Sequence, residues 1–346
     1  MRGINIFGNI TDNFTIAAVK PILLQVTPVP TRDNDSTPNY TFYSDEAGVI
    51  TYSGGCSSDN DTASADNNTI TFNALADATY NDCTITVRDN ASNTSSTLSV
   101  NTFTIDTTGP VLDNVTNVPT PTNDNITSYS FNSSEPGAIT YSGSCESTTS
   151  AAVVGTNNIT FNALADNTYN NCKITVTDSS GNASNNLEVV PFEIDTTAPT
   201  LDNVTDVSTP TDNNTPSYTF RSSEAGTITY GGACGSSTSS AASSGDNTVT
   251  LTRSDNSTPF SDGTYNDCTI VVTDPAGNVS DALDVTTFTV SVPPYLAQVT
   301  AVPTPTSDNT PDYTFRSTEA GTITYGGACG SSTPVSYTPL RAHETD

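Results

Sequence analysis

The feature of this chain that most constrains its fold is an internal repeat of about 90 residues. Four closely related segments begin at Tyr40, Tyr129, Tyr218 and Tyr313 and read YTFYSDEAG, YSFNSSEPG, YTFRSSEAG and YTFRSTEAG. The first two steps are 89 residues long, and the third is 95 because of an insertion around RSDNSTPFSDG, which we expect to be a loop. A period of this length predicts a series of small, similar domains rather than one large core.

The segments that link the copies repeat in the same register and set the expected domain boundaries. FTIDTTGPVLDNVT begins at Phe103, and FEIDTTAPTLDNVT begins at Phe192. The C-terminal segment VSYTPLRAHETD resembles the translation of a transposon-end sequencing adapter and is expected to be non-native, with a genuine polar tail as the alternative. The expected segments are the final strand of a preceding repeat at 1–20, repeat 1 at 21–108, repeat 2 at 109–197, repeat 3 at 198–292, a truncated repeat 4 at 293–334, and the non-native tail at 335–346.

The composition argues against binding to nucleic acids and membranes. Asp and Glu total 37 against 9 Lys and Arg, which gives a formal net charge of −28. Such a chain repels phosphate backbones and anionic lipid surfaces, whereas divalent cations are its natural counterions. No apolar run is long enough to span a bilayer. We therefore expect no nucleic-acid partner and no membrane insertion.

The sequence lacks the side chains on which most enzymes depend. The only histidine, His343, lies in the expected non-native tail, and the lysines are Lys20 and Lys173. Triad and phosphoryl-transfer chemistry are therefore not expected. A carboxylate pair could serve a glycosidase, but the acidic positions recur at the repeat spacing, as structural or metal-binding positions do. We predict that the chain is not an enzyme.

Within each complete copy, apolar residues alternate with Thr and Ser, as in strands that bury one face. In repeat 2 the alternating residues are Tyr129 and Phe131, Ile139 and Tyr141, Ile159 and Phe161, then Cys172, Ile174 and Val176. With a first strand around LDNVTNV and a last around LEVVPFEI, each copy has about seven short strands. The predicted fold class is all-β, with tandem immunoglobulin-like β-sandwich domains.

Three elements of the repeat together resemble a known family. The strand TYNNCKITVT, the loop DSSGN and the linker IDTTAP are similar to the bacterial immunoglobulin-like (Big-type) tandem repeats of large surface adhesins, over roughly residues 1–334. The resemblance implies an extracellular or cell-surface protein made of a monomeric chain of domains. It further implies that a host or matrix surface ligand is bound by regions outside this sequence.

Two functions are compatible with such repeats. One is a structural spacer or stalk that projects a binding tip, which the close similarity of the copies favours. The alternative is a carbohydrate- or protein-binding immunoglobulin-like module, for which a non-repeating aromatic cluster would be the expected sign. The sequence shows no such cluster and contains no Trp. We therefore expect a spacer.

The cysteines depart from the family pattern, which usually lacks them. In the sandwich order, the first cysteine of each repeat ends the third strand and the second begins the sixth, and both ends lie at the same pole of the domain. A bond that closes a separation of 27 residues would stabilise its domain by roughly 3.5 kcal/mol, and such bonds argue for an oxidising compartment. Buried free thiols are the alternative, and a metal site has too few ligands without His. The expected pairs are Cys56 with Cys83, Cys145 with Cys172, and Cys234 with Cys268.

A tyrosine lies three residues before the second cysteine of each complete repeat, at Tyr80, Tyr169 and Tyr265. This is where the tyrosine-corner residue of an immunoglobulin-like domain hydrogen-bonds to the backbone. We expect a structural role for it.

Acidic residues from separate loops are expected to meet where one repeat joins the next. Asp106, Glu135 and Asp178 gather at the entrance to repeat 2, and Asp195, Glu224 and Asp274 are their equivalents for repeat 3. Three carboxylates with backbone carbonyls and water suit Ca²⁺. The alternative is that the Asp of IDTT caps a turn and the others are solvated. The linkers before repeats 1 and 4 lack this Asp and should bind weakly or not at all.

Overall fold

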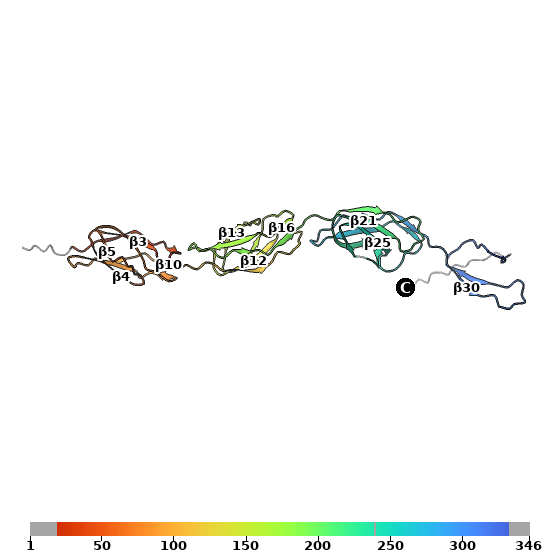
Figure 1. The fold of residues 1–346 in the computed structure, drawn as a ribbon, viewed down its shortest axis with the longest axis horizontal. Coiled ribbons are helices and arrows are strands. Elements are labelled where there is room, and N and C mark those ends of the chain that lie inside the picture. Colours follow the sequence, from red (N-terminus) through yellow and green to blue (C-terminus); the bar gives the residue numbers. More distant parts are fainter. Residues whose placement is uncertain (1–18, 239, 332–346) are drawn as a thin grey trace, which may run out of the picture. The chain divides into compact units, whose positions relative to one another are not determined.

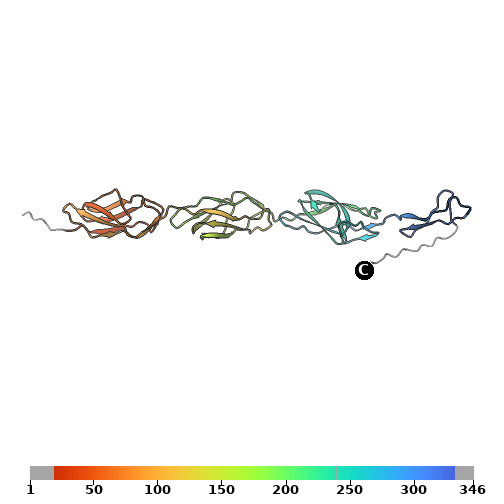
Figure 2. The same cartoon turned by 90° about the horizontal axis from the view of Figure 1, so that it is seen from below.

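The computed structural model describes residues 19–238 and 240–331. These residues form short strands and no helix, and hence no helix that could span a bilayer (Figure 1, Figure 2). By contacts the chain divides into two units, Met1–Asp195 and Thr196–Asp346. Residues 1–18 of the expected preceding strand and the tail 335–346, with His343, lie outside the described residues.

In the first unit, repeats 1 and 2 each form an immunoglobulin-like sandwich. The sheets of repeat 1 are β1 (Leu23–Thr27), β3 (Asn39–Ser44) and β6 (Asp66–Thr71); β5 (Thr62–Ala63), β4 (Gly48–Ser53), β8 (Thr84–Asp89) and β9 (Leu98–Ser99); and β2 (Arg32–Asp33), β10 (Phe103–Ile105) and β7 (Ala78–Tyr80). Those of repeat 2 are β11 (Leu112–Thr116), β12 (Ser128–Ser133) and β15 (Gly155–Thr160); β14 (Ala151–Ala152), β13 (Gly137–Ser142), β17 (Lys173–Thr177) and β18 (Leu187–Glu188); and β16 (Asn167–Tyr169) with β19 (Phe192–Ile194).

In the second unit, repeat 3 has the same arrangement and is followed by a two-stranded sheet. The sheets of repeat 3 are β20 (Leu201–Thr205), β21 (Ser217–Ser222), β25 (Gly245–Arg253) and β23 (Cys234–Ser236); β24 (Ala241–Ala242), β22 (Gly226–Gly231), β27 (Thr269–Thr273) and β28 (Leu283–Asp284); and β26 (Gly263–Tyr265) with β29 (Phe288–Val290). β30 (Leu296–Thr300) pairs with β31 (Thr314–Ser317), and no side chain among residues 293–331 is buried.

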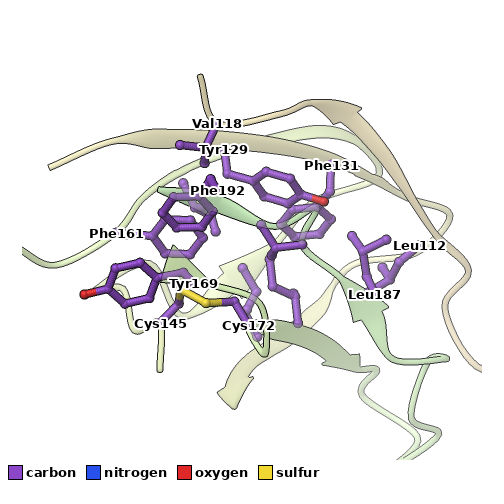
Figure 3. Close-up of a cluster of buried hydrophobic side chains, with 14 of the residues drawn as sticks. Leu112, Val118, Tyr129, Phe131, Cys145, Phe161, Tyr169, Cys172, Leu187 and Phe192 are labelled. Atoms are coloured by element: carbon purple, nitrogen blue, oxygen red, sulfur yellow. A yellow bond between two sulfur atoms is a disulfide. The ribbon is translucent and has the colours of Figure 1, made fainter. Parts of the chain in front are cut away.

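The alternation of apolar and polar residues gives each complete repeat its own core. In repeat 2, β12 buries Tyr129 and Phe131, whereas Ser130 between them is only half-buried. The ring of Tyr129 lies 6.3 Å from that of Phe161, and the ring of Phe161 lies 6.1 Å from that of Phe192. Figure 3 shows these rings beside the sulfur–sulfur bond of the domain. Together with the aliphatic side chains around them, these buried rings form the core of the domain.

The three disulfides present in the structure are the pairs that the sequence analysis expects. Their Cα atoms lie at the usual separation for such bonds. These separations are 5.4 Å for Cys56–Cys83, 5.3 Å for Cys145–Cys172 and 5.1 Å for Cys234–Cys268. The fourth copy of the first cysteine, Cys329, is an exposed free thiol.

The expected tyrosine corners are also formed. The hydroxyl of Tyr80 donates to the carbonyl oxygen of Ala76 at 2.9 Å, and Tyr169 donates to the carbonyl of Ala165 at 2.9 Å. Tyr265 makes the equivalent bond, to Ser261 at 2.8 Å. Each bond ties the start of the sixth strand to the residues just before it.

The structure differs from the predicted strands in two places. The predicted sixth and seventh strands each divide in two, as β16 and β17 and as β18 and β19 do in repeat 2. The division occurs because the chain passes from one sheet to another, at the disulfide-bonded Cys172 in one case and before Phe192 in the other. Second, the insertion of repeat 3 is not wholly a loop. It begins inside β25 and includes Phe260, which is only 3% exposed and packs on Phe288.

Candidate functional site

The candidate site lies where the linker of repeat 1 enters repeat 2, within the first unit. Asp106 directly follows β10, Glu135 lies in the turn between β12 and β13, and Asp178 directly follows β17. Asp106 lies in the linker just before β11, and the sandwich topology places the N-terminal end of a domain at the same pole as the loops of Glu135 and Asp178. Their carboxylate oxygens lie within 4.8 Å of one another, and all three residues are half-buried.

The loop of Asp178 is fixed by its own carboxylate. The Oδ1 atom accepts N–H bonds from Ser180 and Gly181 at 2.8 Å and from Asn182 at 2.9 Å. The Oδ2 atom accepts a bond from the side-chain amide of Asn182 at 2.9 Å. Burial acts to raise the pKa of Asp178, but these hydrogen bonds outweigh it and lower the pKa below the usual value. Asp178 is therefore an ionised group at neutral pH.

Repeat 2 also holds the linker directly. The hydroxyl of Ser180 donates to Asp106 Oδ2 at 3.1 Å, and the side-chain amide of Asn182 donates to the Asp106 carbonyl at 2.7 Å. A little further along, a Cβ atom at Gly109 would lie 2.6 Å from the carbonyl oxygen of Ala183, so this close approach requires glycine. The loop 178–183 thus grips the linker from the side of repeat 2.

Repeat 1 holds the same linker from the other side, through Asp77. Its Oδ1 atom accepts bonds from the N–H of Thr107 at 3.1 Å and from the Thr107 hydroxyl at 2.9 Å. Its Oδ2 atom accepts the hydroxyl of Thr108 at 2.9 Å. The bonds from Thr107 and Thr108 lower the pKa of Asp77 below its usual value. We call Asp77, the linker 106–109 and the loop 178–183 the linker clamp.

The sequence analysis missed Asp77, although a signal for it exists. Aspartate occurs three residues before the tyrosine-corner residue in every complete repeat, as Asp77, Asp166 and Asp262. The carboxylate of Asp262 likewise accepts a hydrogen bond, at 3.0 Å, from the N–H of Val292, which lies two residues after β29. The recurrence marks a position that fastens the outgoing linker.

Negative charge accumulates at the site. The pKa of Glu135 is raised above its usual value by burial and then by the charges of Asp106, Asp178 and Asp77. The corresponding pole of repeat 1 carries Glu46 and Asp89, and the pKa of Glu46 is raised by burial and by Asp89. The charge of Asp45 also acts on Glu46. A cation at either pole would relieve this repulsion, and at the pole of repeat 2 three carboxylates lie within 4.8 Å of one another.

The equivalent residues for repeat 3 fall in both units. Asp195 is the last residue of the first unit, and its N–H donates to the carbonyl of Thr122 at 3.0 Å. In the second unit the buried Asp274 repeats the loop of Asp178, because its Oδ1 atom accepts N–H bonds from Gly277 at 2.8 Å and Asn278 at 2.9 Å. The backbone carbonyl of Glu224 accepts a hydrogen bond from the hydroxyl of Ser222 at 2.6 Å. The expectation of a common site for Asp195, Glu224 and Asp274 stays a prediction.

No protein-family model matches this chain, and no curated protein matches it. Among solved structures it is similar to the D00-D0 domain of intimin, with 12% identity and a TM-score of 0.26, over 49% of this chain and 99% of that one. It is also similar to invasin, a bacterial integrin-binding protein, with 10% identity and a TM-score of 0.30, over 81% of this chain and 62% of that one. A third is α-2-macroglobulin of E. coli, with 10% identity and a TM-score of 0.16, over 82% and 24%.

Proposed function

We propose that this chain is a spacer of an extracellular or cell-surface adhesin-type protein. The observation that carries the proposal is the linker clamp. A flexible linker would leave its polar groups to solvent, whereas here side chains of both repeats bind it, through Asp77 on one side and Ser180 and Asn182 on the other. A linker that is bound by both repeats transmits direction from one domain to the next, as a stalk requires.

The disulfides and the sequence resemblance support the proposed location. One disulfide in each complete repeat is characteristic of proteins that fold in an oxidising compartment. The resemblance to Big-type repeats of surface adhesins agrees with this. In this proposal the chain has no catalytic role, and the host or matrix ligand is bound by parts of the protein outside this sequence.

We further propose that Asp106, Glu135 and Asp178 bind Ca²⁺ and stiffen the linker clamp. The proximity of the three carboxylates and the raised pKa of Glu135 support this, since an ion would remove the repulsion between groups already held together. In such a site Asp178 keeps its loop bonds and presents the remaining lone pairs of its carboxylate. Carbonyl oxygens and water would complete the six to eight ligands that Ca²⁺ takes.

Amide hydrogen exchange of the linker tests the spacer. In the full chain without Ca²⁺, Asp77→Ala removes three hydrogen bonds to Thr107 and Thr108, so the linker amides should exchange about tenfold faster. Asp113→Ala is the matched control, because it removes an equal charge from an exposed strand position nearby. Equal exchange in the wild type, Asp77→Ala and a free peptide of residues 103–112 would refute the clamp.

Calorimetric titration of the full chain with Ca²⁺ tests the metal separately. Asp106→Asn keeps the shape of the side chain and should reduce the number of bound ions by one, together with the Ca²⁺-dependent rise in melting temperature. Asp113→Asn should bind as many ions as the wild type. If the wild type releases no heat with Ca²⁺ and its melting temperature does not rise, the calcium proposal is wrong and the spacer proposal is unaffected.

A further inference from the structure

Repeat 3 departs from the other repeats because of the extra residues between Leu251 and Phe260. β25 is 9 residues long, whereas its equivalents β6 and β15 have 6 each. The added length pairs with β23, in the register Cys234↔Arg253 to Ser236↔Leu251. The insertion therefore adds a strand pair, β23 with the end of β25, that lies beside β22. We call this strand pair and its turn the wall.

The turn of the insertion is firmly anchored. The side-chain oxygen of Asn256 accepts the N–H of Ser236 at 3.1 Å, and the Asn256 N–H donates to the Arg253 carbonyl at 2.9 Å. A Cβ atom at Gly235 would lie only 2.6 Å from the backbone carbonyl oxygen of Arg253, so glycine is needed where the turn meets β23. The wall thus has a defined position relative to the strand that it faces.

Between this wall and β22 lies a groove of about 650 Å³, in the size range of small-molecule sites. The side chains that matter for its chemistry are Tyr230 from β22, Ser237 and Ser240 from the segment after β23, and Ser254 and Asn256 from the insertion. The groove belongs entirely to repeat 3. A groove in repeat 2, lined by residues that include Gly143 and Leu164, measures about 160 Å³.

The lining is uncharged although the chain carries a net charge of −28. The hydroxyls of Ser237, Ser240 and Ser254 make no hydrogen bond to the part of the chain that the structure describes. They are therefore available to a ligand. The half-buried Tyr230 adds an aromatic surface to this array of donors and acceptors.

We propose that this groove binds a neutral saccharide. Hydroxyl and amide groups without net charge match a ligand that is itself rich in hydroxyls, and an aromatic ring matches the apolar face of a sugar ring. An anionic ligand would be repelled by the acidic chain, and a cationic one would find no carboxylate in the groove. Repeat 3 then combines its place in the spacer with a weak binding site of its own.

Saturation-transfer NMR of the full chain with neutral oligosaccharides of glucose, galactose and mannose tests the proposal. At least one of them should bind, and the double variant Ser240→Ala with Ser254→Ala should weaken its affinity at least tenfold. Ser150→Ala in repeat 2 is the matched control, since the exposed Ser150 is the equivalent of Ser240, and should leave binding unchanged. Hydrogen exchange of β25 and β27 verifies that the double variant keeps its fold.

Three results would overturn the saccharide site. The first is that none of these oligosaccharides binds at millimolar concentration. The second is binding that the folded double variant retains in full. The third is a stronger response to sialylated oligosaccharides than to neutral ones, because the groove has no cationic side chain to bind a carboxylate. None of these results bears on the linker clamp, which is tested without a saccharide.

Discussion

β21 and β31 carry nearly the same sequence but lie in different surroundings. Each pairs with the strand before it in the same register, Leu201↔Ser222 in one case and Leu296↔Ser317 in the other. β21 has a second neighbour, β25, whereas β31 has no second neighbour among the described residues. Tyr218 is 0% exposed, and its equivalent Tyr313 is 54% exposed. The sequence of a strand therefore selects which face is apolar, but strands from much later in the repeat decide whether that face is buried.

The largest expected difference between the two strands is in hydrogen exchange. The amides of β21 are bonded within a closed core and should exchange only by unfolding of repeat 3. Those of β31 lie in a two-stranded sheet, which is marginal in water. We expect exchange at least about a thousandfold faster in β31, measured by mass spectrometry on the full chain. Comparable rates in the two strands would mean that β31 is buried after all.

Truncation of the equivalent tyrosines Tyr218 and Tyr313 should show the same difference in the free energy of unfolding. Tyr218→Ala removes a fully buried ring and should lower the free energy of unfolding of repeat 3 by about 4 kcal/mol. Tyr313→Ala removes an exposed ring and should change stability by less than about 0.5 kcal/mol. Urea unfolding of the full chain, followed by hydrogen exchange in β21 and β27, measures both. A loss of similar size in both variants would contradict the comparison.

The cysteines allow the same test with a covalent bond. Cys234 and Cys329 occur in the same sequence, YGGACG, but only Cys234 is bonded, to Cys268, at a sequence separation of 34. In the loop-entropy account this bond contributes about 3.8 kcal/mol. Replacing Cys234 and Cys268 with Ala should shift the urea midpoint of repeat 3 accordingly, whereas Cys329→Ala should leave it unchanged. An unchanged midpoint in the double variant would show that the bond adds no stability.

Local patterns were sufficient for much of the fold. The alternation around Tyr129 and the position of Tyr169 before Cys172 predict burial and the tyrosine corner, because both depend on strand period and sandwich order. The divided strands and the buried Phe260 were not predictable in this way. They arise where the chain changes sheets or where an insertion is absorbed, which depends on contacts distant in sequence.

The candidate site was likewise predictable in part from the sequence. Asp106 lies in the linker that enters repeat 2, and Glu135 and Asp178 lie in loops at the same pole, so sandwich order predicts that their carboxylates meet. Asp77 was missed because it acts on the linker from the other repeat, and no strand pattern points to it. Its recurrence before each tyrosine corner is a signal that repeat alignment alone could have exposed.

The smallest expected effect concerns a single hydroxyl group. Tyr40 is buried and donates to Gln25 at 3.2 Å, but the buried hydroxyls of Tyr129 and Tyr218 have no hydrogen-bond partner in the described structure. Repeat 3 has the shorter Asn203 at the position of Gln25, and its amide bonds to Asp206 instead. An unsatisfied buried hydroxyl costs free energy, whereas a satisfied one stabilises.

Phenylalanine substitutions separate these cases. Tyr40→Phe should destabilise repeat 1 by about 1 kcal/mol, Tyr218→Phe should be neutral or stabilise repeat 3 by up to about 1 kcal/mol, and Tyr313→Phe should have no effect.

Burial raises the pKa of Tyr218 to about 12, so its phenol ionises near pH 10 only in the unfolded chain. The unfolded state then binds fewer protons, and the stability of repeat 3 should fall between pH 10 and about 12. Tyr218→Phe should reduce that fall in urea titrations at high pH. If it instead destabilises repeat 3 at neutral pH as much as Tyr40→Phe destabilises repeat 1, the hydroxyl of Tyr218 is hydrogen-bonded and the account of the two environments is incomplete.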